Sequence, residues 1–143
     1  MSETIPSLQT GTSTVAPSST RGWEVMCHLS SVIGMLGYLG MIPFGNIAAP
    51  LVVWLLKRNE SLGVDAHGKE SLNFHISWTL YWLIGMAVVT TLCFVLIGFL
   101  LIPVMIVVGV AGWFVMLILT LIASVKASNG LIYRYPLTIR FLK

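Results

Sequence analysis

The chain has 143 residues, of which 57% are hydrophobic and only 9% are charged, with a formal net charge of +3. A soluble domain usually carries about 25% charged residues, so this chain has too few to cover a water-facing surface. Its eight Lys and Arg residues lie at the ends of apolar segments, where anionic lipid headgroups attract them, and this argues against a nucleic-acid partner. Composition and length predict a single domain in a lipid bilayer.

Two long segments, residues 25–56 and 71–125, contain no Asp, Glu, Lys or Arg. A bilayer core of ~30 Å needs ~20 helical residues, so the second segment can cross twice with a tight turn between. The first is too long for one upright crossing and short for two. These lengths predict an all-α, polytopic membrane helix bundle. It has either four hydrophobic helices, the second one short, or three with the first kinked; we favour four, with the first two forming a hairpin.

In chain order, residues 1–22 are predicted to be a disordered tail, because they are polar and contain two prolines. They lack the basic start and apolar core of a cleavable signal peptide. A transmembrane domain follows over residues 23–130, with helices expected at about 23–41, 47–57, 69–99 and 104–127.

Proline and glycine place the predicted breaks between these helices. Pro43 lacks a backbone donor and disfavours helix at the residue before it, which separates the first two helices. Gly98 and Pro103 frame the next turn, and Asn129-Gly130 ends the last helix as a C-cap.

The basic residues of the connections predict the orientation. The loop at residues 57–70 holds three Lys or Arg and the chain after residue 125 holds four, whereas residues 98–103 hold none. By the positive-inside rule, the loop and the C-terminus lie on the cytoplasmic side of a multi-pass protein of the cell inner (plasma) membrane. The N-terminus is cytoplasmic if the first two helices form a hairpin, and outside if they are one kinked helix.

The main candidate site is a group of polar residues at the start of the third predicted helix: Asp65, His67, Lys69, Glu70, Asn73, Ser77 and Tyr81. The last four have the spacing i, i+3, i+7 and i+11, which places them on one helix face. Lipid cannot satisfy their hydrogen bonds, so this face must turn toward protein or water. It is interpreted either as a polar path or partner surface, or as an ordinary helix start, capped by Asp65 and hydrogen-bonded to neighbouring helices.

No catalytic, cofactor-binding or metal-binding residues are predicted. Zinc needs three or four convergent ligands, whereas His28 stands alone in its segment and no HExxH or CxxC motif occurs. His75 is five residues from Glu70 and so lies on a different helix face. Cys27 and Cys93 lie in apolar stretches, where a cysteine usually behaves as a small buried hydrophobe.

The C-terminal segment, residues 131–143, mixes aromatic, basic and apolar side chains. Such a segment lies well in the headgroup region, with basic side chains reaching toward water. It is predicted to be an interfacial anchor, with a partner-docking surface as the alternative; its candidate residues are Tyr133, Arg134, Tyr135 and Arg140.

Two motifs, VDAHGKESLNFHIS at residues 64–77 and KASNGLIYRYP at residues 126–136, resemble a widespread bacterial family of uncharacterised small membrane proteins with a domain of unknown function. That family has an HGKE(A/S)LNFQ-like element before a long membrane helix and a YRYP-like element after the last one. The resemblance covers about residues 24–143. His75 stands where Gln is common, which argues against a fixed chemical role for it. The family is distantly similar to the Tic-type import component of the chloroplast inner envelope, a fold-level analogy.

The resulting functional hypothesis is a non-enzymatic accessory or scaffold subunit of a membrane complex. Its expected partners are the lipid bilayer and either another membrane protein or further copies of itself, with no nucleic acid and no cofactor. The alternative is an oligomeric translocation or permeation protein that uses the polar face from Glu70 to Tyr81. A membrane enzyme is the least favoured hypothesis, because no catalytic constellation is present.

Overall fold

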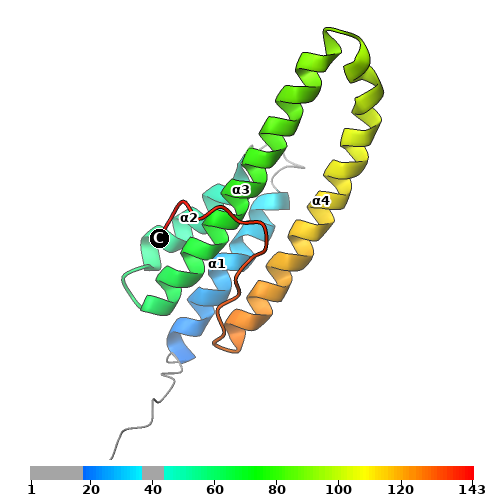
Figure 1. Ribbon diagram of the computed structural model, residues 1–143. Helices are drawn as coiled ribbons and strands as arrows, with labels where there is room; N and C mark the ends of the chain where they lie inside the picture. Colours follow the sequence, from blue (N-terminus) through cyan, green and yellow to red (C-terminus); the bar gives the residue numbers. More distant parts are fainter. Residues whose placement is uncertain (1–17, 37–43) are drawn as a thin grey trace, which may run out of the picture.

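The computed structural model describes residues 18–36 and 44–143, which contain four α-helices and no strand (Figure 1). The helices are α1 (Ser18–Leu36), α2 (Gly45–Lys57), α3 (Leu62–Cys93) and α4 (Ile97–Ser128). This confirms the all-α prediction with four helices and a short second one.

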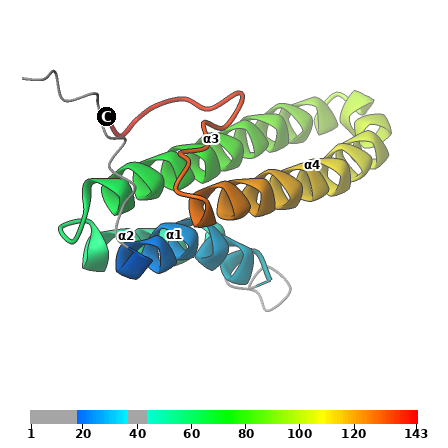
Figure 2. The ribbon, with the colours of Figure 1, turned by 90° about the horizontal axis from the view of Figure 1, so that it is seen from below.

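The long helices α3 and α4 form an antiparallel hairpin, and α1 and α2 pack beside only one half of it (Figures 1 and 2). The other half, with the α3–α4 turn, projects beyond α1 and α2. The start of α1, the end of α2, the start of α3 and the end of α4 therefore meet at one end of the molecule. We call this the polar end: residues 18–24, 57–70 and 126–143. It holds all eight Lys and Arg residues.

Helix α3 begins at Leu62, earlier than the predicted start near residue 69, because Ser61 caps it. Ser61 has an extended backbone, and its side chain accepts a hydrogen bond from Val64 N at 3.0 Å. A serine in this position satisfies one of the free N–H groups of the first helical turn. The polar residues from Asp65 onward therefore lie within a continuous helix.

The turn between α3 and α4 lies at residues 94–96, before the predicted position. Backbone hydrogen bonds close it, including Leu96 N to Cys93 O at 3.1 Å, and Leu96 has a left-handed φ of 64°. Pro103 consequently lies inside α4, where it was expected to frame the turn. Membrane helices tolerate a proline when neighbouring groups compensate for its missing backbone N–H. Pro103 therefore does not break the helix, contrary to the prediction from the usual preference of proline for turns.

At the other end of the chain, residues 18–22 are helical, so the predicted tail of residues 1–22 extends too far. Residues 1–17 lie outside the described residues, as do residues 37–43, which include the predicted end of the first helix and the break at Pro43.

Helices α1 and α2 are separate and meet at two glycines. A Cβ atom added to Gly34 would collide with the backbone oxygen of Gly45, so the two backbones are in direct contact. Small residues permit this close approach between membrane helices. The structure therefore has the favoured hairpin and excludes one kinked helix.

Helices α3 and α4 are the two described helices that are long and apolar enough to cross a membrane. Only 6% and 11% of their most apolar windows are buried in the protein, respectively, so they are not core helices of a soluble fold. Each has 32 residues and extends ~48 Å, more than the ~30 Å hydrocarbon layer. The excess length lies beside α1 and α2, where Met35, Phe74, Met116, Ala123 and Tyr135 form the buried core.

The glycine contact gives a matched pair of substitutions in α1. Gly34→Ala should destabilise the protein by about 1–3 kcal/mol, the usual cost of overpacking. Gly22→Ala adds the same methyl group where nothing lies within 4 Å, and should leave stability unchanged or raise it by up to about 1 kcal/mol. Thermal unfolding of both variants in the same detergent measures the difference. Equal midpoints would contradict the close helix contact.

Candidate functional site

The polar stripe of α3, defined as Glu70, Asn73, Ser77 and Tyr81, holds the C-terminal segment. This segment leaves the end of α4 and runs back along α3 toward its start (Figures 1 and 2). Tyr81 Oη donates to Leu137 O at 3.0 Å, and Ser77 Oγ accepts from Ile139 N at 2.8 Å. These contacts involve the backbone of the segment, so they do not depend on its side chains.

Asn73 makes the central contacts of the stripe. Its Oδ1 accepts from Phe141 N at 3.0 Å and from Leu142 N at 2.8 Å, and its Nδ2 donates to Leu142 O at 2.9 Å. Both ends of the amide are therefore used, although the side chain is buried. An amide that offers a donor and an acceptor side by side matches the backbone of an extended chain.

Glu70 adds the one ion pair of the stripe, with Arg140 Nη2 at 3.3 Å from Glu70 Oε1. The carboxylate side chain is 12% exposed and the guanidinium 43%. A half-exposed pair contributes little to stability, so Glu70 chiefly fixes where along α3 the segment lies. In this structure the protein's own C-terminal segment covers the stripe predicted from spacing.

A second polar group lies inside the polar end and consists of Glu24, His28, His67 and Tyr135, all nearly inaccessible to solvent. We call it the buried histidine chain. His28 Nε2 is 3.0 Å from His67 Nδ1, and Tyr135 Oη is 3.0 Å from His28 Nδ1. His67 Nε2 lies 3.9 Å from Glu24 Oε2. Helices α1 and α3 and the C-terminal segment each contribute to it.

The two 3.0 Å contacts are compatible with neutral imidazoles in which Tyr135 donates to His28 Nδ1 and His28 Nε2–H donates to His67 Nδ1. In that arrangement His67 Nε2–H faces the Glu24 carboxylate at 3.9 Å, which is beyond hydrogen-bond distance. Burial raises the pKa of the Tyr135 phenol above its ordinary value, and burial also raises the pKa of Glu24 against an opposing effect of Arg21.

The buried histidine chain is not arranged as a metal centre. His67 directs its two ring nitrogens at different neighbours, His28 and Glu24, and one imidazole cannot bind a single ion through both. Among the residues the structure describes, no three His, Cys, Asp or Glu side chains converge on a point that could hold a metal.

The other predicted residues of α3 face away from the stripe. Asp65 accepts a hydrogen bond from Trp54 Nε1 at 2.9 Å and pairs with Lys69 Nζ at 2.6 Å. Gly68 makes room for this arrangement, since a Cβ atom there would collide with Trp54. The predicted site therefore divides into three: the stripe, His67 in the buried histidine chain, and the Asp65–Lys69 pair against α2.

The predicted anchor residues of the C-terminal segment also separate. Tyr135 is only 4% exposed and stacks on Phe74 with ring centroids 4.1 Å apart, so it lies in the core and not among lipid headgroups. Tyr133 lies beneath the Lys126 ammonium, 5.0 Å from it, and Arg134 is exposed. The sequence did not indicate that His28 and Tyr135 would meet, because they lie 107 positions apart.

Asn73→Leu should release the end of the C-terminal segment, because it removes three hydrogen bonds worth about 1 kcal/mol each. Limited trypsin digestion followed by mass spectrometry should show faster cleavage after Arg140 than in the wild type. Asn129→Leu is the control, since the Asn129 side chain donates only to Val125 O of α4. Unchanged cleavage in Asn73→Leu would show that the stripe does not hold the segment.

Tyr135→Phe should lower stability by about 1–3 kcal/mol, because it keeps the stacking on Phe74 and leaves His28 Nδ1 without its donor. Tyr133→Phe removes the same hydroxyl from a neighbouring, partly exposed ring and should change stability by less than about 0.5 kcal/mol. Thermal unfolding of the two variants measures this difference. Equal losses would mean that the histidine contact contributes nothing specific.

Comparison with known proteins gives one family. A family model described as the magnetosome magnetite crystal formation protein family matches residues 19–142, which include three of the four helices, all of α1 except its first residue, and nearly the whole C-terminal segment. The match supports the predicted membership of a membrane protein family. The family found has a described role, whereas the sequence motifs led us to expect a family of uncharacterised proteins. The match gives no support to the Tic-type similarity. No curated protein and no solved structure matches the chain.

Proposed function

The chain belongs to the magnetosome magnetite crystal formation protein family, and on this basis we propose that it is a non-enzymatic accessory or scaffold subunit of the membrane in which such crystals form. The observation that carries the proposal is the extent of the match. It runs from the first residues of α1 to the last residues held by the stripe, and so concerns the whole architecture and not one motif.

The polar end supports a scaffold role. Its backbone is held by the stripe, by the Ser61 cap and by the buried core, which makes it a firm surface next to two membrane-crossing helices. Several of its basic side chains are exposed and available to acidic groups of a partner protein or of lipid: Arg58, Lys126, Arg134 and Lys143. We place this end on the cytoplasmic side, because its connections carry the basic residues.

Permeation along the stripe is a weaker proposal. The C-terminal segment occupies the hydrogen-bonding groups that would line a polar route, so the segment would have to leave before water or a solute could follow them. In the chain as described, these groups serve to hold protein backbone.

The proposed function can be tested in a magnetite-forming bacterium that lacks its own member of this family. Expression of the chain should restore the size distribution of magnetite crystals, measured by electron microscopy, because the family model matches residues 19–142. Immunoblotting of the membrane fraction confirms that the protein is present. Normal membrane levels with unrestored crystals would overturn the proposal.

The same assay separates a scaffold from an enzyme. Tyr135→Phe removes the hydroxyl from the buried histidine chain, a buried group of four titratable side chains. A scaffold requires only that the protein folds, so crystals should be restored wherever the membrane level of this variant matches the wild type. Loss of restoration at a matched level would indicate chemistry at this chain and contradict the non-enzymatic role.

A further inference from the structure

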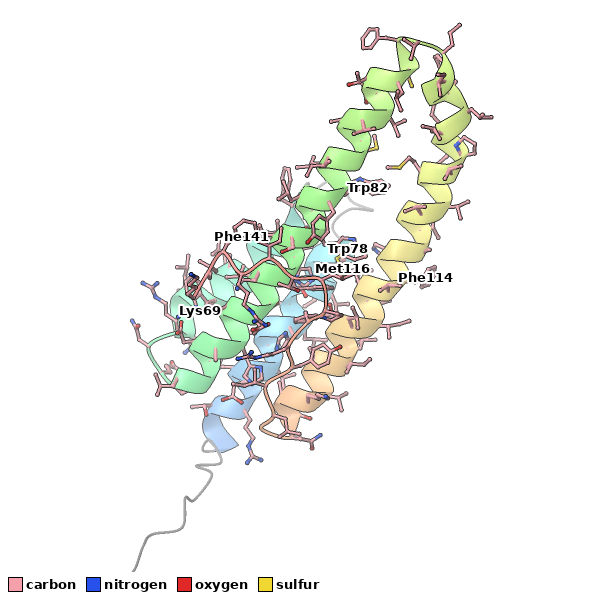
Figure 3. The ribbon with its side chains drawn as sticks, viewed as in Figure 1. Lys69, Trp78, Trp82, Phe114, Met116 and Phe141 are labelled. Atoms are coloured by element: carbon pink, nitrogen blue, oxygen red, sulfur yellow. The ribbon has the colours of Figure 1, made fainter. Side chains whose placement is uncertain are left out.

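A cavity of about 450 Å³ lies where the α1–α2 hairpin meets the middle of the α3–α4 hairpin. All four helices line it: Met35 of α1, Asn46 of α2, Trp78, Thr79 and Trp82 of α3, and Gly109, Trp113 and Met116 of α4. Trp78, Trp82 and Met116 lie in the space between α3 and α4, whereas Phe114 is on the outer side of α4 (Figure 3). Neither the stripe nor the buried histidine chain contributes to this cavity.

Two glycines of α4 make the cavity compatible with large indole rings. A Cβ atom on Gly109 would lie 2.5 Å from Trp82 Cη2, and one on Gly112 would lie 2.8 Å from Trp78 Cζ2. The outer carbon atoms of both rings therefore contact α4 at positions that have no side chain. Three tryptophans and two methionines then form an apolar wall, which is a common composition for a small-molecule site.

Asn46 is the polar feature of this wall that lacks a full set of partners. The residue is only 2% exposed, its Nδ2 donates to Thr79 Oγ1 at 3.4 Å, and its Oδ1 has no hydrogen-bond partner. A buried acceptor without a partner costs about 1–3 kcal/mol. The protein therefore has, on a residue that lines this cavity, a buried acceptor that lacks a hydrogen-bond donor.

The surroundings restrict what can reach this acceptor. The α3 and α4 residues that line the cavity all lie in the charge-free segment 71–125, and the outer faces of these two helices carry exposed apolar side chains such as Leu83, Ile106 and Phe114. The cavity thus lies between helices that face hydrocarbon and has a mostly apolar wall, which favours an occupant soluble in hydrocarbon. No cationic side chain lines it, so a phosphate headgroup has no counter-charge, whereas a hydroxyl group needs none.

We propose that this cavity binds a neutral membrane lipid that carries a hydroxyl group. The hydroxyl donates to Asn46 Oδ1, and the hydrocarbon chain lies against Trp78, Trp82 and Trp113. Binding supplies the missing partner of the buried amide and fills the space between the two hairpins, so the lipid also joins α1 and α2 to the membrane-crossing pair.

The tryptophans provide a direct readout, because bromine quenches indole fluorescence on contact. The full chain in phosphatidylcholine nanodiscs is titrated with dibrominated octadecanol and, separately, with its methyl ether. The two probes differ only in the hydrogen-bond donor. Saturable quenching should appear at roughly fivefold lower concentration for the alcohol than for the ether, the ratio that corresponds to a net hydrogen bond of about 1 kcal/mol.

Variants then locate the site. Asn46→Leu should abolish the preference for the alcohol. Gly109→Ala, which forces Trp82 into the cavity, should weaken both probes together and serves as a second test if the first variant folds poorly. Thr91→Val is the control and should retain the full preference, since it removes an exposed hydroxyl that bonds only Ala87 O within α3.

Three results would overturn the proposal. Quenching that rises linearly without saturation would mean that there is no site. Equal affinity for alcohol and ether in the wild type would mean that the cavity accepts any acyl chain. A preference that survives in a folded Asn46→Leu variant would mean that the donor is recognised elsewhere.

Discussion

A polar side chain surrounded by hydrocarbon has to find its hydrogen-bond partner within the protein, and the layout of this molecule follows from how α3 meets that requirement. The stripe of Glu70, Asn73, Ser77 and Tyr81 lies on a helix that continues into a membrane-crossing segment. The C-terminal segment supplies the partners, mostly through its backbone. Because the segment must run along α3, it also carries Tyr135 into the core, where it meets Phe74 and His28. One requirement thereby ties together the first helix, the third helix and the end of the chain.

Helices α1 and α2 are held together by close backbone packing and not by polar contacts with the C-terminal segment. Their contact at Gly34 and Gly45 lets two backbones touch, as is common where no hydrophobic effect drives helices together in lipid. The polar side chains of α1 point inward to the buried histidine chain, while outward positions such as Leu29 and Ile33 are apolar. The arrangement is the inverse of a soluble bundle. It leaves Asn46 as a buried amide without a full set of partners, at the cavity between the two hairpins.

Much of the fold was predictable because it depends on local composition. The charge-free segment 71–125 has the length of two crossings, and α3 and α4 occupy it. The spacing of Asn73, Ser77 and Tyr81 correctly placed them on one face. The boundaries were less accurate. Ser61 begins α3 earlier than the apolar pattern suggests, and three backbone hydrogen-bonded residues form the α3–α4 turn without glycine or proline, so Pro103 was given too much weight.

The sequence by itself determined that this is a helical membrane protein with charged groups at one end and a polar face on its third helix, because hydropathy and helical spacing are properties of neighbouring residues. Only the tertiary structure decided what that face binds. Asn73 and Leu142 are 69 positions apart, and His28 and Tyr135 are 107 apart. Contacts over such separations depend on how whole helices pack, and that packing cannot be read from the spacing within any single segment.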